Sequence, residues 1–160
     1  MTAALKIVPD RCTGCMQCEL ACSWSKTGTF QPTASLIRVH IFDEEAAYAP
    51  YTCLQCDEAW CMTVCPTHAI VQDEATGTKR IVSTLCIGCH LCSLTCPFGT
   101  VFTRPDNGQA AKCDLCEGQP ACSAVCPTDA IEFVEPKQPG EWFGPWGDRV
   151  AQRHAEAFGT

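Results

Sequence analysis

The stretch Cys86-Ile87-Gly88-Cys89-His90-Leu91-Cys92-Ser93-Leu94-Thr95-Cys96-Pro97 decides the fold of this chain, and its spacing is C-x2-C-x2-C-x3-C-P. A tight loop through the first three cysteines can place their thiolates on three corners of one metal cluster. The x3 gap, about one helical turn, carries Cys96 away from that cluster, so the fourth thiolate needs a second cluster. Gly88 allows positive φ, which lets consecutive N–H groups turn toward the metal site. Pro97 suits a chain that leaves the helical turn after its last ligand.

A cysteine quartet of this kind occurs four times, and this internal repeat organises the chain. Every quartet ends in the x3 gap, but the middle gap widens to four residues in the second and to five in the fourth. Ser23 stands where the other quartets have proline, and the first gaps of the second and fourth quartets lack glycine. We predict that all sixteen cysteines are ligands of four clusters: Cys12, Cys15, Cys18, Cys22; Cys53, Cys56, Cys61, Cys65; Cys86, Cys89, Cys92, Cys96; and Cys113, Cys116, Cys122, Cys126.

Disulfides and structural zinc are the alternatives for so many cysteines. No basic region followed by an apolar stretch and a cleavage site is visible at the N-terminus, so the secretory setting of a disulfide scaffold is not indicated. Zinc sites usually take two ligands from each of two separated knuckles. Here three ligands fall within seven residues in two quartets, and a Cys-Pro step ends three quartets. The pattern is typical of 4Fe-4S clusters, and zinc is the weaker alternative.

Charge and hydropathy limit the partners of the chain. The formal net charge is -7 and no basic patch occurs, so we expect no nucleic-acid binding. No apolar run is long enough to span a membrane, and we expect a cytoplasmic protein. If each site adds roughly -2, four clusters bring the charge to about -15, which favours basic docking surfaces. Only 8% of the residues are aromatic, so we expect a thin core and an apo chain that is largely unfolded.

Short elements surround the quartets, as expected of an α+β fold. Apolar and β-branched runs predict strands, and Gly- or Asn-containing segments at 74–78 and 104–108 predict turns, the first of them within a hairpin. We expect strands at 5–8, 36–42, 69–71, 80–82 and 127–133, and helical turns at 17–24, 62–64, 93–95 and 123–125.

No constellation for independent catalysis is present. There is no G-x-G-x-x-G or phosphate loop, and the four histidines have no serine or carboxylate arrangement around them. Residues 136–160 form a cysteine-free tail with Trp142, Phe143 and Trp146. These aromatic side chains either cover the clusters of this chain or contact a partner, and the sequence leaves both open.

Several phrases resemble the four-cluster electron-transfer subunits of molybdenum and tungsten oxidoreductases. The similar motifs are the first quartet at Cys12–Cys22, the segment Lys112–Cys116 and the repeated Cys-Pro-Thr-x-Ala-Ile motif, and the order of the quartets is similar as well. The likeness covers about residues 5–135. Within this group the chain is most similar to the small iron-sulfur subunit of bacterial tungsten aldehyde oxidoreductase.

The resemblance implies two ferredoxin-like units, one inserted in the other. Residues 1–48 and 98–135 would form the outer unit, and residues 49–97 the inserted unit. Each cluster would take three cysteines from one quartet and the fourth from another. The implied sets are Cys12, Cys15, Cys18 with Cys126; Cys113, Cys116, Cys122 with Cys22; Cys53, Cys56, Cys61 with Cys96; and Cys86, Cys89, Cys92 with Cys65. The hairpin at 69–82 independently favours the inner pairing.

The same resemblance implies a non-catalytic electron-transfer subunit with four 4Fe-4S clusters. It would relay single electrons between a catalytic subunit holding a tungsten or molybdenum pterin and another redox partner, such as a flavin subunit. Self-association into a longer chain of clusters is a further implication. The alternatives are a subunit of a carbon monoxide dehydrogenase, formate dehydrogenase or hydrogenase, and a free diffusible polyferredoxin.

Overall fold

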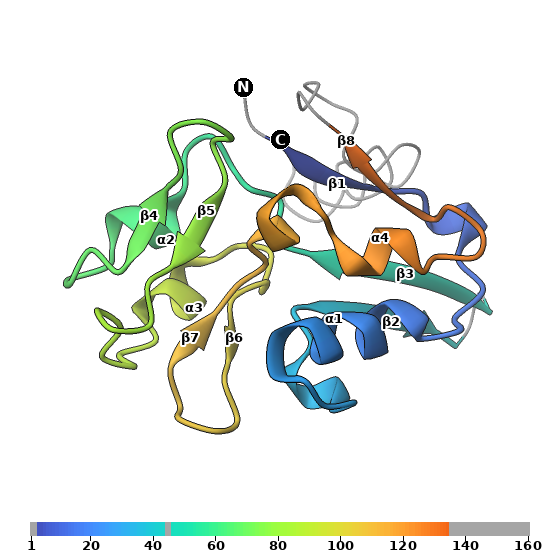
Figure 1. Ribbon diagram of the computed structural model, residues 1–160, viewed down its shortest axis with the longest axis horizontal. Helices are drawn as coiled ribbons and strands as arrows, with labels where there is room; N and C mark the ends of the chain where they lie inside the picture. Colours follow the sequence, from blue (N-terminus) through green and yellow to red (C-terminus); the bar gives the residue numbers. More distant parts are fainter. Residues whose placement is uncertain (1–2, 44–45, 135–160) are drawn as a thin grey trace, which may run out of the picture.

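The computed structural model describes residues 3–43 and 46–134, so the aromatic tail at 136–160 lies outside the described residues. In these residues short strands pair in four antiparallel two-stranded sheets. β1 (Ala4–Ile7) pairs with β8 (Ile131–Val134), which brings the two ends of the described chain together. The other three pairs are hairpins of neighbouring strands (Figure 1).

Two of these hairpins form around the turns that the sequence predicts. β4 (Ile70–Gln72) and β5 (Lys79–Ile81) enclose the turn at 74–78, where the carboxylate of Asp73 accepts hydrogen bonds from the backbone of Ala75 and Thr76 at 3.0 and 2.9 Å. β6 (Phe102–Thr103) and β7 (Ala110–Ala111) enclose the turn at 104–108. Both predicted turns are therefore confirmed.

The hairpin of β2 (Ile37–Phe42) and β3 (Ala47–Thr52) was predicted only in its first strand. β3 contains Pro50, which faces Val39 across the hairpin. Proline donates no ladder hydrogen bond and is tolerated at a sheet edge. Because β3 pairs with β2 alone, its other edge does not need that donor.

Four α-helices lie where helical turns are predicted, and each contains the third cysteine of a quartet. α2 (Trp60–Thr63), α3 (Leu91–Thr95) and α4 (Ala121–Ala124) are single turns. α1 (Gln17–Thr27) is longer because Ser23 replaces the proline that follows the other quartets. The fully buried Ser23 hydroxyl donates to the Leu20 carbonyl at 2.9 Å, and the helix ends at Gly28 in the left-handed conformation.

The core consists of two clusters in which cysteines and aliphatic side chains pack together. The larger joins Leu5, Ile7 and Ile131 to buried cysteines of α1 and α4. The smaller surrounds Ile70 and Val101 near α3 and β7. Figure 1 shows β4, β5, α2 and α3 on one side of the molecule and α1, α4, β1, β2, β3 and β8 on the other, with β6 and β7 between them. The chain thus forms a small α+β fold in which cysteine side chains fill much of the interior.

None of the helices within the described residues is long and apolar enough to cross a membrane.

Candidate metal centres

Three cavities are each lined by four cysteines, three from one quartet and one from another. We name the cysteine sets site A, site C and site D. Site A is Cys12, Cys15, Cys18 and Cys126. Site C is Cys53, Cys56, Cys61 and Cys96. Site D is Cys65, Cys86, Cys89 and Cys92.

The remaining four cysteines, Cys22, Cys113, Cys116 and Cys122, form site B between α1 and α4. Burial raises the pKa of the Cys122 thiol, and the charges of the other three raise it further. Ser25 of α1 places its hydroxyl 3.8 Å from the Cys116 sulfur. Three of the combinations that the resemblance implies thus line cavities, and three cysteines of the fourth, Cys22, Cys113 and Cys122, pack in one core cluster.

The packing of cysteines from different sites gives the order A, B, C, D: one core cluster joins Cys18 of site A and Cys53 of site C to the buried cysteines of site B, and in the other cluster Cys61 of site C packs beside Cys92 of site D. The charges that act between cysteines agree with this order. Burial is the main cause of the raised pKa values of Cys122, Cys113 and Cys92, and a cysteine of a neighbouring site adds to each. Cys18 of site A acts on Cys122 of site B, and Cys53 of site C acts on Cys113 of site B. Likewise, Cys61 of site C acts on Cys92 of site D.

Only two of the sixteen cysteines are exposed, and they belong to the two end sites of this order. Cys15 lies in site A and Cys89 in site D. The cysteines of sites B and C are buried or half-buried. The middle of the series is therefore shielded, whereas both ends reach the surface.

The residue before the second cysteine of each quartet has the same left-handed backbone. Gly14 and Gly88 have φ of 69° and 70°, as their lack of a Cβ allows. Gln55 and Leu115, which replace glycine in the other two quartets, adopt φ of 51° and 58°. Successive N–H groups in such turns form concave anion-binding surfaces, so the turn geometry is present even where the sequence lacks glycine.

Gln55 is a site residue that the sequence analysis missed. Its side chain is fully buried; Nε2 donates to the Cys113 carbonyl at 2.7 Å, and Oε1 accepts from the Lys79 backbone N–H at 2.8 Å. One amide thus ties the loop of site C to the chain of site B and to β5. The only sequence signal is a glutamine at the position where two other quartets have glycine.

The fourth cysteine of each quartet receives hydrogen bonds on its sulfur. The backbone N–H groups of Leu36, Ala69 and Ala130 lie 3.3, 3.2 and 3.2 Å from the sulfurs of Cys22, Cys65 and Cys126, respectively. The Thr100 hydroxyl lies 3.5 Å from the Cys96 sulfur.

These hydrogen bonds stabilise the thiolate form at three positions. Burial raises the pKa of Cys65, Cys96 and Cys126, but hydrogen bonds from nearby threonine hydroxyls and backbone N–H groups outweigh it, so each pKa lies below its ordinary value. In contrast, burial raises the pKa of Cys18 to about 12. Thiolate is the form that binds metal, so a metal must displace the proton of the buried thiols.

The donor chemistry of the four sites fits 4Fe-4S clusters. Four thiols surround each site, and 4Fe-4S clusters are held by four cysteine thiolates with hydrogen bonds to sulfur. Among the described residues, no three His, Cys, Asp or Glu side chains converge closely enough to hold a single metal ion. That the four sites bind clusters stays a prediction.

Aromatic residues beside the cysteines lie partly in solvent. Trp60 and Phe98 line the cavity of site C and are 57% and 48% exposed. Trp24 of α1 stacks on Phe30 with ring centroids 4.9 Å apart. His90 lies beside site D with Nδ1 3.4 Å from the Thr103 hydroxyl.

Comparisons with known proteins agree with this chemistry. A family model described as a 4Fe-4S dicluster domain matches residues 44–136, and one described as a 4Fe-4S binding domain matches residues 9–28. The chain is 40% identical over 132 residues to the polyferredoxin-like subunit of aliphatic sulfonate oxidoreductase from Pyrococcus furiosus, covering 80% of this chain and 75% of that protein. It is 35% identical over 149 residues to the electron transport protein HydN of Escherichia coli, covering 79% and 84%.

Its fold is similar to a chain of the active site complex BamBC of benzoyl coenzyme A reductase. The TM-score is 0.51 and the identity is 25%, with 88% of this chain and 80% of that chain covered.

Proposed function

This chain belongs to the 4Fe-4S dicluster family of ferredoxin-like electron-transfer proteins, and we propose that it relays single electrons through four 4Fe-4S clusters within an oxidoreductase complex. The observation that carries the proposal is the gathering of cysteines into three-plus-one sets around separate cavities. Zinc sites usually take two ligands from each of two knuckles, whereas paired 4Fe-4S clusters take three ligands from one quartet and the fourth from another.

The sixteen cysteines would hold the clusters as sites A to D. A bound 4Fe-4S cluster supplies one-electron redox chemistry. The protein would supply the thiolates that bind the iron, the N–H and hydroxyl groups that donate hydrogen bonds to sulfur, and the apolar surface that limits the access of water to the clusters. The order A, B, C, D favours entry and exit of electrons at sites A and D, where Cys15 and Cys89 are exposed.

Two ferredoxin-like units, one inserted in the other, agree with this order. The outer unit, residues 1–48 and 98–135, would contain sites A and B, and the inserted unit, residues 49–97, would contain sites C and D. Support comes from the pairing of β1 with β8 at the ends of the described chain and from the hairpin β4–β5 between quartets two and three.

The catalytic partner in our proposal is a subunit with a tungsten or molybdenum pterin, such as an aldehyde oxidoreductase. The relative in Pyrococcus furiosus is itself a subunit of an oxidoreductase, which supports a stable complex. A flavin subunit would be the second redox partner. In this assignment the chain transfers electrons and catalyses no reaction of its own.

Size exclusion of a native anaerobic extract tests the assignment. We expect this chain to elute with a much larger protein and with tungsten or molybdenum in the same fractions. Elution at the mass of a single chain would contradict the complex and favour a free polyferredoxin. Large particles that contain only this chain would indicate self-association instead.

A further inference from the structure

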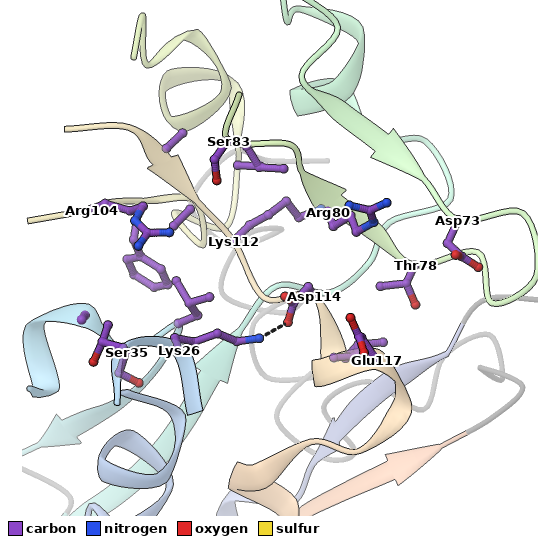
Figure 2. A pocket seen from close by; sticks show the side chains of 18 of the residues that line it. Lys26, Ser35, Asp73, Thr78, Arg80, Ser83, Arg104, Lys112, Asp114 and Glu117 are labelled. Atoms are coloured by element: carbon purple, nitrogen blue, oxygen red, sulfur yellow. Dashed lines mark hydrogen bonds and ion pairs between the residues drawn. The ribbon is translucent and has the colours of Figure 1, made fainter. Parts of the chain in front are cut away.

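A cavity of about 690 Å³ separates the end of α1 from the hairpins β4–β5 and β6–β7. Four cations line it, Lys26, Arg80, Arg104 and Lys112, in a chain with only eleven Lys and Arg residues and a net charge of -7 (Figure 2). Four positive side chains thus share the lining of one cavity.

Three of the four cations have a carboxylate nearby. Lys26 forms an ion pair with Asp114 at 2.5 Å, drawn in Figure 2, and Arg104 forms one with Asp106 at 3.2 Å. Hydrogen bonds from Thr76 lower the pKa of Asp73, and the charge of Arg80 adds to that effect. Each of these three positive charges thus has a negative charge close to it.

Lys112 differs from the other three in burial and surroundings. Lys112 is 4% exposed, and no ion pair between described residues includes it. It follows β7, directly before Cys113 of site B, and it lines both the large cavity and the cavity of site C. Burial raises the pKa of Cys61 in site C, and the charge of Lys112 opposes that increase.

A buried ammonium group is costly unless negative charge compensates it. Glu58 and the four cysteines of site C line the same cavity as Lys112, and the charge of Lys112 favours the thiolate form of Cys61. A cluster bound to these cysteines as thiolates would add its own net negative charge. The attraction is stronger in the interior than at the surface, because the effective dielectric constant is lower there. It also grows when a cluster accepts an electron.

We propose that Lys112 is a positioning residue that sets the reduction potential of site C, making it easier to reduce than it would be beside a neutral side chain. This inference rests on the proposed function, because it requires a cluster at site C. An easily reduced site in the middle of the series would hold an electron between the two ends.

Redox titration of the intact holoprotein, followed by EPR, tests the proposal. In Lys112→Met we expect the reduction potential of one of the four clusters to become more negative, so that this cluster is harder to reduce. At the midpoint of the unaltered protein, the ratio of reduced to oxidised cluster should fall about tenfold, which is 59 mV for a one-electron couple. Cys56→Ser, which changes a ligand of site C, identifies the step that belongs to this site. Lys112→Arg keeps the charge and should restore the potential.

Arg104→Gln is the matched control, because it removes a cation of the same cavity that already has a carboxylate partner. We expect Arg104→Gln to leave the four reduction potentials unchanged. An equal shift in Arg104→Gln would overturn the proposal by showing a general effect of net charge. Unchanged potentials in Lys112→Met, or in the polar neutral variant Lys112→Gln if the first loses iron, would also overturn it. A protein without iron would overturn the proposed function itself.

Discussion

Single side chains hold the loops that present the cysteines, and Gln55 illustrates this most clearly. Its amide satisfies a carbonyl beside site B and an N–H of β5 at the same time. Buried polar groups that lose their only partner cost much more than exposed ones. The geometry of site C therefore depends on a residue that is not itself a ligand.

We expect Gln55→Ala to lower the free energy of unfolding by about 3 kcal/mol, because it leaves two buried backbone groups without partners. Gln109→Ala is the control: this side chain also bonds to two backbone groups, donating to the carbonyls of Ser83 and Cys86, but in a more exposed setting. The measurement is the urea concentration at which the visible absorbance of the clusters is lost. Equal midpoints for the two variants would contradict the role of Gln55.

Gly14 is constrained by a neighbour as well as by its backbone. A Cβ on Gly14 would lie 2.6 Å from Cδ1 of the Tyr48 ring, whereas a Cβ on Gly28, which has the same φ of 69°, would contact nothing within 4 Å. We expect Gly28→Ala to cost about 1 kcal/mol from backbone strain and Gly14→Ala about 1–3 kcal/mol more. The same urea experiment checks this, and adding Tyr48→Ala to Gly14→Ala should recover part of the loss. No recovery would mean that the ring is not the obstacle.

At the scale of elements, the cysteine spacing predicts more than the residues between the quartets do. The four helices follow from the x3 gap, and the two turns follow from Gly and Asn residues. β3 was missed because Pro50 argues against a strand, and only its place at a sheet edge makes it acceptable. The left-handed backbone of Gln55 and Leu115 was also not predictable, because tertiary contacts rather than residue type impose it.

The two core clusters connect particular elements to particular sites. Ile7 of β1 packs in the cluster that contains Cys18, Cys22, Cys113 and Cys122, and Ile70 of β4 packs in the cluster that contains Cys92. Both side chains are nearly inaccessible to solvent. Truncation of either to alanine should cost about 3 kcal/mol by leaving a cavity.

The two truncations should differ in which cysteines they expose. We expect alkylation in partial denaturant to label the cysteines of sites A and B first in Ile7→Ala, and those of sites C and D first in Ile70→Ala. Mass spectrometry of the labelled peptides makes the comparison. Identical labelling patterns would show that the two clusters unfold as one unit.

At the scale of the whole molecule, the sixteen cysteines do two things at once. Six of them occupy buried positions that larger apolar side chains fill in other small proteins, and all sixteen fall into four sets in one order. The membership of each set follows from the family resemblance, and three of the sets line cavities of their own. That all sixteen cysteines hold clusters stays a prediction. The sequence could not predict the order A, B, C, D, because that order arises from the packing of cysteines that lie far apart in the sequence.

The net charge is also a property of the whole molecule. The chain carries a formal charge of -7 before any cluster is bound, while four of its cations surround an internal cavity. Bound 4Fe-4S clusters would make this net charge more negative still. Docking surfaces of partners should therefore be basic, and association should weaken as salt increases.

The most direct test of the account is the content of iron and acid-labile sulfide per chain in anaerobically purified protein, followed by EPR after reduction with dithionite. We predict about sixteen iron and sixteen sulfide atoms per chain, with signals of interacting 4Fe-4S clusters. Zinc in place of iron, with no EPR signal, would contradict the account and leave a structural scaffold in its place.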